Sequence, residues 1–176
     1  MKTPILLTLL LTVLLVSCDS QGDAAPNQSD SANQVSGVDY DFWVSIEDAQ
    51  EMAYDEGKHI VLDIYAEWCG FCRRMNEETY GDERVQEALN SYYYPVRIDA
   101  ESNSEITFLG ETYTKSELAM QFGVGSYPTT VFLSPTGEPI AVQPGFIDPR
   151  EFHRMLTYVG TERYETESYQ EFSAAN

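Results

Sequence analysis

The stretch Trp68-Cys69-Gly70-Phe71-Cys72 decides how this 176-residue chain folds. An apolar run, His59-Ile60-Val61-Leu62-Asp63-Ile64-Tyr65, precedes it and predicts a buried strand. The segment from Arg73 to Thr79 follows directly and predicts a helix. The first cysteine therefore lies at a helix N-terminus, where unpaired N–H groups and the helix dipole favour a thiolate. The second lies about one turn further on, so the pair is suited to reversible dithiol–disulfide exchange.

A structural zinc site is the alternative reading of a C-x-x-C pair. A tetrahedral zinc site needs about four ligands, whereas the chain has three cysteines and two histidines, with no second pair at ligand spacing. His59 at a strand start and His153 in a C-terminal helix are interpreted as ordinary packing or surface residues. Redox chemistry is therefore favoured over zinc, and no metal or other cofactor is expected.

The third cysteine, Cys18, closes an apolar N-terminal segment. Residues 5–16 form an almost unbroken apolar run that is short for a membrane span, which takes about 20 residues. The run suits a signal-peptide core and ends in Leu15-Val16-Ser17-Cys18, which resembles the bacterial lipoprotein cleavage signal. We expect residues 1–17 to be a lipoprotein signal peptide and Cys18 to carry lipid. A standard signal peptide with an incidental cysteine is the alternative.

The segment after Cys18 is polar and lacks apolar periodicity. Residues 19–37 are mostly Gln, Gly, Asp, Ala, Asn and Ser, a composition that predicts a disordered tether. A flexible segment of this length has an r.m.s. reach of roughly 25 Å. The predicted organisation is a lipidated cysteine and tether (18–37), a folded domain (38–160) and a polar C-terminal extension (161–176). Aromatic side chains that can pack the extension back onto the domain are Tyr164, Tyr169 and Phe172.

The formal charge of −19 comes from 29 acidic and 10 basic residues. Nucleic-acid binding requires clustered lysine and arginine, and the acidic character of this chain therefore argues against nucleic acid as a partner. It also argues against electrostatic adhesion to anionic lipid, so membrane attachment would depend on the lipid at Cys18. Solubility is the simplest reason for the excess acid.

Helices and strands alternate along the predicted domain. Helix starts and stops, such as Ser45 before residue 46 and Gly57 after residue 56, support an α/β fold. The expected helices cover residues 45–56, 82–90, 114–122 and 148–159, and the expected strands cover 93–99, 129–133 and 139–142.

This order resembles the thioredoxin superfamily over about residues 41–160. In addition to W-C-x-x-C, Asp63 lies six residues before the first cysteine, as the buried acid does in that family, and Tyr127-Pro128-Thr129 fits the place of its cis-proline. The long loop over 100–113 is more similar to exported, membrane-associated thioredoxin-like proteins. The resemblance implies a central mixed sheet flanked by helices.

The chain departs from the family at the lysine that neighbours the buried acid. Pro95 occupies the likeliest position, and Arg97 lies two residues further on. If Arg97 does not reach Asp63, the proton relay of the family would be altered.

The resemblance and the residues together imply a mechanism. Cys69 attacks a substrate disulfide as a thiolate, and Cys72 resolves the mixed disulfide. Asp63, within an apolar strand, should have a raised pKa and could take the proton of Cys72. Replacing Asp63 by Asn is expected to leave the fold intact and to raise stability, because a buried carboxyl is removed. Trp68, Tyr127 and Pro128 are expected to form the substrate-binding rim.

The direction of electron flow stays open at this stage. We expect a lipid-anchored protein thiol-disulfide oxidoreductase that faces the periplasm, reduces disulfides of exported proteins and receives electrons from a membrane donor. A disulfide oxidase or isomerase is one alternative. A redox-inert binding protein or copper carrier, with Cys69 and Cys72 as soft ligands, is another.

Overall fold

The computed structural model describes residues 40–175. The predicted signal peptide, the lipidated Cys18 and the tether therefore lie outside the described residues, and these predictions stay predictions. Within 40–175, no helix combines the length and the apolar character needed to cross a bilayer.

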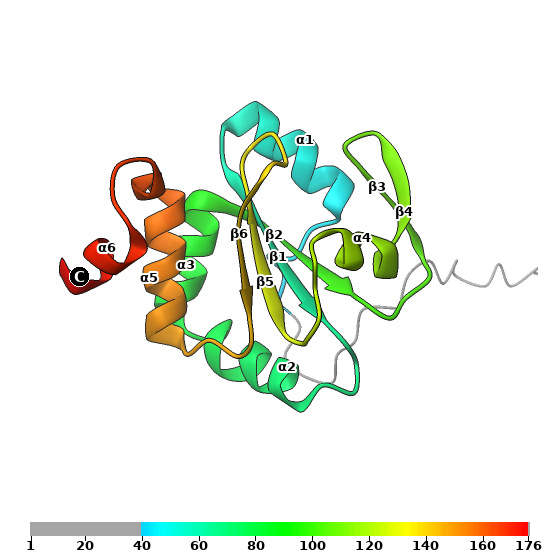
Figure 1. Ribbon diagram of the computed structural model, residues 1–176, viewed down its shortest axis with the longest axis horizontal. Helices are drawn as coiled ribbons and strands as arrows, with labels where there is room; N and C mark the ends of the chain where they lie inside the picture. Colours follow the sequence, from blue (N-terminus) through cyan, green and yellow to red (C-terminus); the bar gives the residue numbers. More distant parts are fainter. Residues whose placement is uncertain (1–39, 176) are drawn as a thin grey trace, which may run out of the picture. The chain divides into compact units, whose positions relative to one another are not determined.

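A four-stranded sheet forms the centre of the domain (Figure 1). Its strands are β1 (His59–Tyr65), β2 (Tyr93–Asp99), β5 (Thr129–Leu133) and β6 (Pro139–Pro144), in the order β2-β1-β5-β6. β1 runs parallel to β2 and antiparallel to β5, and β6 is antiparallel to β5. Every residue of β1 is buried, as its central position requires. The predicted α/β fold with a mixed central sheet is confirmed.

The structure contains the helix-capping residues from which the helix boundaries were predicted. α1 (Ile46–Glu56) begins after Ser45, whose hydroxyl accepts the Asp48 N–H, and ends at Gly57 with φ of 71°. α4 (Lys115–Gln121) starts with a capping box formed by Thr114 and Glu117. α5 (Pro149–Gly160) follows Asp148 as N-cap, with proline in its first turn.

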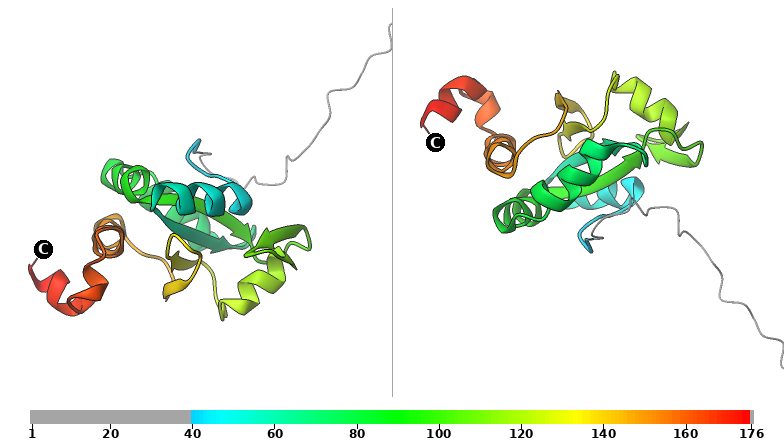
Figure 2. Two further views of the ribbon diagram at one scale, coloured as in Figure 1. Left: turned by 90° about the horizontal axis from the view of Figure 1, so that it is seen from above. Right: turned by 90° about the horizontal axis from the view of Figure 1, so that it is seen from below.

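Helices cover both faces of the sheet (Figure 2). α1 and α4 pack on one face, against the side chains of Ile60, Leu62 and Ile64. α3 (Glu83–Tyr92) and α5 lie side by side on the other face, where Val61 and Phe132 point. The alternation along β1 follows from the two-residue period of a strand. Asp63 shares this period with Val61 and so lies on the face of α3 and α5.

Two segments differ from the sequence prediction. The helix expected over 73–79 begins earlier, as α2 (Gly70–Arg74), and widens into a π-helix, η1 (Met75–Thr79). The loop expected over 100–113 contains a hairpin of β3 (Glu105–Phe108) and β4 (Glu111–Thr114). Its two turn residues, Leu109 and Gly110, both have positive φ, of 50° and 81°. Two-residue hairpin turns favour this conformation because it matches the twist of the flanking strands.

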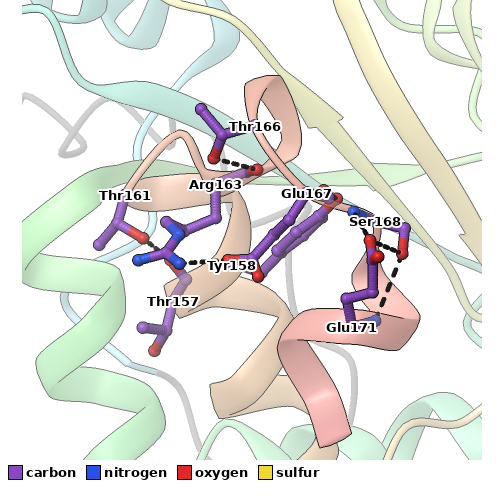
Figure 3. Close-up of polar contacts among 8 residues, drawn as sticks. All are labelled: Thr157, Tyr158, Thr161, Arg163, Thr166, Glu167, Ser168 and Glu171. Atoms are coloured by element: carbon purple, nitrogen blue, oxygen red, sulfur yellow. Dashed lines mark hydrogen bonds and ion pairs between the residues drawn. The ribbon is translucent and has the colours of Figure 1, made fainter. Parts of the chain in front are cut away.

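The C-terminal extension folds against α5 (Figure 3). It forms a short 3-10 helix, η2 (Arg163–Glu165), and a last helix, α6 (Tyr169–Ala175). The Tyr158 hydroxyl of α5 donates to the Glu167 carbonyl at 2.7 Å, and Arg163 forms an ion pair with Glu167. Phe172 is buried against the Tyr158 ring. The Tyr169 ring packs edge-on against Tyr158, and Tyr164 packs against His59, so the expectation that aromatic residues pack this segment back is confirmed for all three.

Candidate active site

The two cysteines of the C-x-x-C motif form a disulfide at the start of α2. Their Cα atoms lie 5.2 Å apart. Cys69 is the N-cap residue, and its sulfur accepts a hydrogen bond from the Cys72 N–H at 3.0 Å. The same N–H would stabilise a Cys69 thiolate, together with the positive end of the helix dipole. Both side chains are buried in the disulfide form, Cys69 at 4% exposure and Cys72 at 2%, so the two cysteines differ little in exposure.

Aromatic side chains surround the disulfide. Trp68 and Phe71 are the exposed ones, at 67% and 61%. The Tyr127 ring packs edge-on against Trp68, with ring centroids 5.9 Å apart, and also contacts the cluster that contains both cysteines. The Trp68 indole N–H donates to the Glu101 carboxylate at 2.9 Å. The exposed indole is therefore held in one orientation beside the disulfide.

The rim is acidic on the side of Glu101. A hollow of about 600 Å³ opens next to Trp68. Its lining residues are Glu67, Trp68, Asp99, Glu101 and Ser102.

Hydrogen bonds fix the proline loop that faces the cysteines. The Tyr127–Pro128 peptide bond is cis. The Pro128 carbonyl accepts the Gly145 N–H at 2.8 Å, and the Thr129 hydroxyl donates to the Ser126 carbonyl at 2.7 Å. Of the three residues predicted to form the rim, Trp68 and Tyr127 thus lie beside the disulfide, and Pro128 is the next residue after Tyr127.

The acid predicted in β1 is buried and paired. Asp63 is 2% exposed, and its Oδ2 accepts a hydrogen bond from Arg97 Nε at 3.0 Å. Loss of hydration raises the pKa of Asp63 above its ordinary value, whereas the charge and hydrogen bond of Arg97 oppose the rise. The predicted direction is confirmed. Pro95, the likeliest position for a cation from the sequence, instead faces Val61 across the parallel pair.

Two aromatic rings stabilise the buried Arg97 guanidinium. Its carbon lies 4.4 Å from the centroid of Tyr65 and 5.2 Å from that of Trp43. Cation–π contacts of this kind strengthen where water is excluded, and the planar guanidinium is suited to them. Trp43 belongs to the segment before α1 that also packs against Tyr80.

Some site residues that were not predicted have a recognisable signal in the sequence. Asp63 and Arg97 are each the fifth residue of a seven-residue strand, and the two strands pair in register from their first residues. Tyr80 lies five residues after the buried Met75, a spacing that only the wider turn of the π-helix η1 brings onto one face, where the Tyr80 N–H donates to the Met75 carbonyl. Glu101 follows the end of β2, next to the end of β1 that leads to the cysteines. No signal pointed to Trp43.

The zinc alternative finds no ligand set in the described part of the chain. Over residues 40–175, no group of three or more His, Cys, Asp or Glu side chains could hold a metal ion. His59 is buried beside the rings of Tyr93 and Tyr164. His153 lies on α5.

Comparison with known proteins gives a consistent result. The thioredoxin-like domain family matches residues 46–160. The thiol:disulfide interchange protein DsbD of Yersinia pestis (strain Pestoides F) is 28% identical over 152 residues, which is 84% of this chain and 24% of that protein. DsbD of Actinobacillus pleuropneumoniae serotype 5b is 27% identical over 74% of this chain and 21% of its own length. The chain thus spans about a quarter of the length of the curated relatives that it matches.

Solved structures show the same fold. A putative disulphide-isomerase from Bacteroides thetaiotaomicron has a TM-score of 0.52 and 26% identity, with 77% of this chain and 99% of that chain covered. A thioredoxin-fold protein from Helicobacter pylori has a TM-score of 0.59 at 18% identity, with 68% and 80% covered. With a disulfide at the start of the helix that follows β1, and with a family match over most of the folded residues, the chain belongs to the thioredoxin-like domain family.

Proposed function

We propose that this protein reduces disulfide bonds of exported proteins by dithiol exchange through Cys69 and Cys72. The position of Cys69 carries the proposal. Its sulfur caps α2 and accepts the Cys72 N–H, so the attacking group can be held as a thiolate. The similarity to DsbD, whose name describes thiol:disulfide interchange, favours exchange with protein partners.

The exchange transfers two electrons in two steps. The Cys69 thiolate attacks one sulfur of the substrate disulfide, forms a mixed disulfide and releases the other substrate sulfur as a thiolate. The Cys72 thiolate then attacks the Cys69 sulfur, which restores the Cys69–Cys72 disulfide and releases the second substrate thiolate. The substrate is reduced and the protein is oxidised, and a dithiol donor must reduce the pair again.

Asp63 is proposed to accept the proton of Cys72. The acid lies in β1, two residues before Tyr65, which packs in one cluster with both cysteines. Burial raises its pKa, and a raised pKa makes the carboxylate a stronger base toward the Cys72 thiol. Asp63→Asn should slow turnover at neutral pH, and kinetics unchanged across the pH range would give Asp63 a structural role only.

The aromatic rim is proposed to bind the substrate segment around its disulfide. Trp68 and Tyr127 supply apolar surface beside Cys69. Pro128 lacks a backbone donor and fixes the adjoining loop, so that neighbouring backbone can pair with an extended substrate segment.

A lipid at Cys18 is proposed to anchor the protein to a bacterial membrane, facing the periplasm. The sequence Leu15-Val16-Ser17-Cys18 supports this attachment. Disulfides persist outside the cytoplasm, so a reductase there needs an electron donor, and a membrane protein that passes electrons outward would be within reach of the tether. Cys18→Ala should abolish lipid labelling and release the protein from membranes.

Trapping of partners tests the proposed function. Cys72→Ser should accumulate mixed disulfides with exported proteins through Cys69, whereas Cys69→Ser, the matched control, should not. The redox potential gives the direction. A reductase should lie near the reducing end of the family, about −270 mV, and a strong oxidant near about −120 mV. A potential near the oxidising end would contradict the reductase assignment.

Isomerase activity is the second candidate, favoured by the similarity to a putative disulphide-isomerase. An isomerase would restore activity to a scrambled disulfide protein without consuming a stoichiometric reductant. A copper carrier would give no trapped partner and would bind Cu(I) through the two thiolates.

A further inference from the structure

Four buried polar atoms lie in or beside the Asp63–Arg97 pair, and among residues 40–175 none of them makes a hydrogen bond of strict geometry, although Tyr80 lies close enough to interact with both Asp63 and Thr130. They are Asp63 Oδ1, Arg97 Nη2, the Tyr80 hydroxyl and the Thr130 hydroxyl. Tyr80 and Thr130 are fully buried. Buried polar atoms without a well-formed hydrogen bond lower the stability of a protein and are uncommon. Four of them in one cluster therefore need a physical explanation.

The fold brings these groups together from three strands and a helix end. Thr130 in β5 and Arg97 in β2 are the two register partners of Asp63 in β1, so the three residues form one row across the sheet. The hydroxyl of Tyr80, which follows η1, lies within side-chain hydrogen-bonding reach of both Asp63 and Thr130. The Tyr80 ring is held edge-on between Trp43 and Phe152.

The four groups differ in what they can exchange. Arg97 only donates hydrogen bonds, and an ionised carboxylate only accepts them. A hydroxyl does both, because its hydrogen can rotate. The hydroxyls of Tyr80 and Thr130 can therefore donate to the Asp63 carboxylate and can also accept from the protonated carboxyl, whereas Arg97 can only donate.

We propose that Tyr80 is a positioning residue whose hydroxyl reverses its hydrogen bond with Asp63 when Asp63 gains or loses the proton that it exchanges with Cys72. This inference rests on the role proposed for Asp63. With Asp63 ionised, the Tyr80 O–H donates to Oδ1 and accepts from the Thr130 hydroxyl. With Asp63 protonated, the carboxyl O–H donates to Tyr80, which donates to Thr130. Each hydroxyl keeps its own proton, and only the proton of Asp63 is gained or lost.

Among the groups of this cluster, Asp63 is the one whose charge can change, because its neighbours keep theirs. Burial raises the pKa of Tyr65, on the same strand, to about 12, and it raises the pKa of Tyr80 well above its ordinary value. Thr130 does not titrate, and an arginine keeps its proton. The negative charges of Glu67 and Asp99 contribute to the raised pKa of Tyr65.

Titration of Asp63 in a Tyr80→Phe variant tests the inference. The substitution removes one hydroxyl and leaves the ring. Since hydrogen bonds to a charged group are the stronger ones, the ionised carboxylate loses more than the acid does. We expect the Asp63 pKa, read from its side-chain 13C carboxyl resonance in the reduced protein, to rise by about one unit, a roughly tenfold change in proton affinity. The midpoint of the pH–rate profile should move with it.

Tyr93→Phe is the matched control. Tyr93 is a second buried tyrosine of the same apolar cluster, but its hydroxyl donates to the Leu156 carbonyl at 2.7 Å. Its replacement should lower stability without moving the Asp63 midpoint. An unchanged or lowered midpoint in Tyr80→Phe, or an equal shift in Tyr93→Phe, would overturn the inference.

A measurement on the unmodified protein provides a second test. The Tyr80 hydroxyl proton is buried and should exchange slowly, and its 1H signal should move upfield as Asp63 takes up a proton. A signal that stays constant through the Asp63 titration would also overturn the inference. Both readings require no substrate, so they are independent of the Asp63→Asn kinetics that test the proposed function.

Discussion

Replacing Arg97 by Met should destabilise the fold in a pH-dependent way. The two side chains of the Asp63–Arg97 pair are 2% and 4% exposed and lie 3.0 Å apart. Removing one partner of such a buried pair leaves the other charge without compensation, which costs about 3–5 kcal/mol. Methionine fills most of the space of the arginine stem, so the loss of charge dominates the expected effect.

The sign of the pH dependence follows from Asp63. Its pKa is higher in the folded protein than in the unfolded chain, where it is about 3.9. Folding therefore favours the protonated carboxyl, and the free energy of unfolding falls as the pH rises from about 4 through the folded-state pKa. Without the opposing charge of Arg97, the folded-state pKa rises further. The cost of Arg97→Met should thus be larger at pH 8 than at pH 5.

Urea denaturation followed by circular dichroism at these two pH values measures the effect. A double-mutant cycle with Asp63→Asn isolates the coupling, because the double variant has neither charge and should lose less stability than the sum of the single variants. Arg84→Met is the control, since Arg84 pairs with Asp82 on the surface and should change stability little. Equal costs at both pH values, together with additive single variants, would refute the reasoning.

Three further predictions concern other parts of the domain. Glu101→Gln should weaken the hold on the Trp68 indole, seen as faster fluorescence depolarisation of Trp68 and an about two- to tenfold lower kcat/KM. Phe172→Ala should release the C-terminal segment shown in Figure 3 from α5, at a cost of about 3 kcal/mol, and limited proteolysis should then cleave after residue 160. Burial lowers the pKa of His59, so folding favours its neutral form, and stability should fall as the pH drops below about 6.5. His59→Gln should remove that part of the pH dependence of urea denaturation.

Local signals in the sequence were sufficient for most of the fold. Ser45, Thr114 and Asp148 mark helix starts because their side chains accept N–H groups of the first turn, and that interaction needs no distant contact. β1 was predictable because a strand buried on both faces is apolar throughout. The hairpin β3–β4 was missed because its two strands have only four residues each and one buried face.

From the residues alone, the candidate site was predictable only where one segment contains it, whereas Tyr127 and Pro128 were assigned to it through the resemblance to thioredoxins. Cys69, Cys72 and Trp68 are neighbours in sequence, so their proximity needed no fold. The partner of Asp63 depended on strand register, and a shift of two residues separates Pro95 from Arg97. The pairing of Asp63 with Arg97 also reverses the expectation that Asp63→Asn raises stability. With Arg97 in place, that substitution leaves a buried cation unpaired, so we expect a loss of stability.

The replacement of a lysine by Arg97 has a consequence for proton transfer. A buried lysine can lose its proton, and so can share acid–base work with a neighbouring carboxyl. An arginine does not deprotonate in proteins, and Arg97 is further held by the rings of Tyr65 and Trp43. The cation beside Asp63 is therefore constant, and it opposes protonation of the carboxyl at every working pH. Proton exchange at this site must then depend on Asp63 and on groups that can reverse a hydrogen bond, which in this cluster are the hydroxyls of Tyr80 and Thr130.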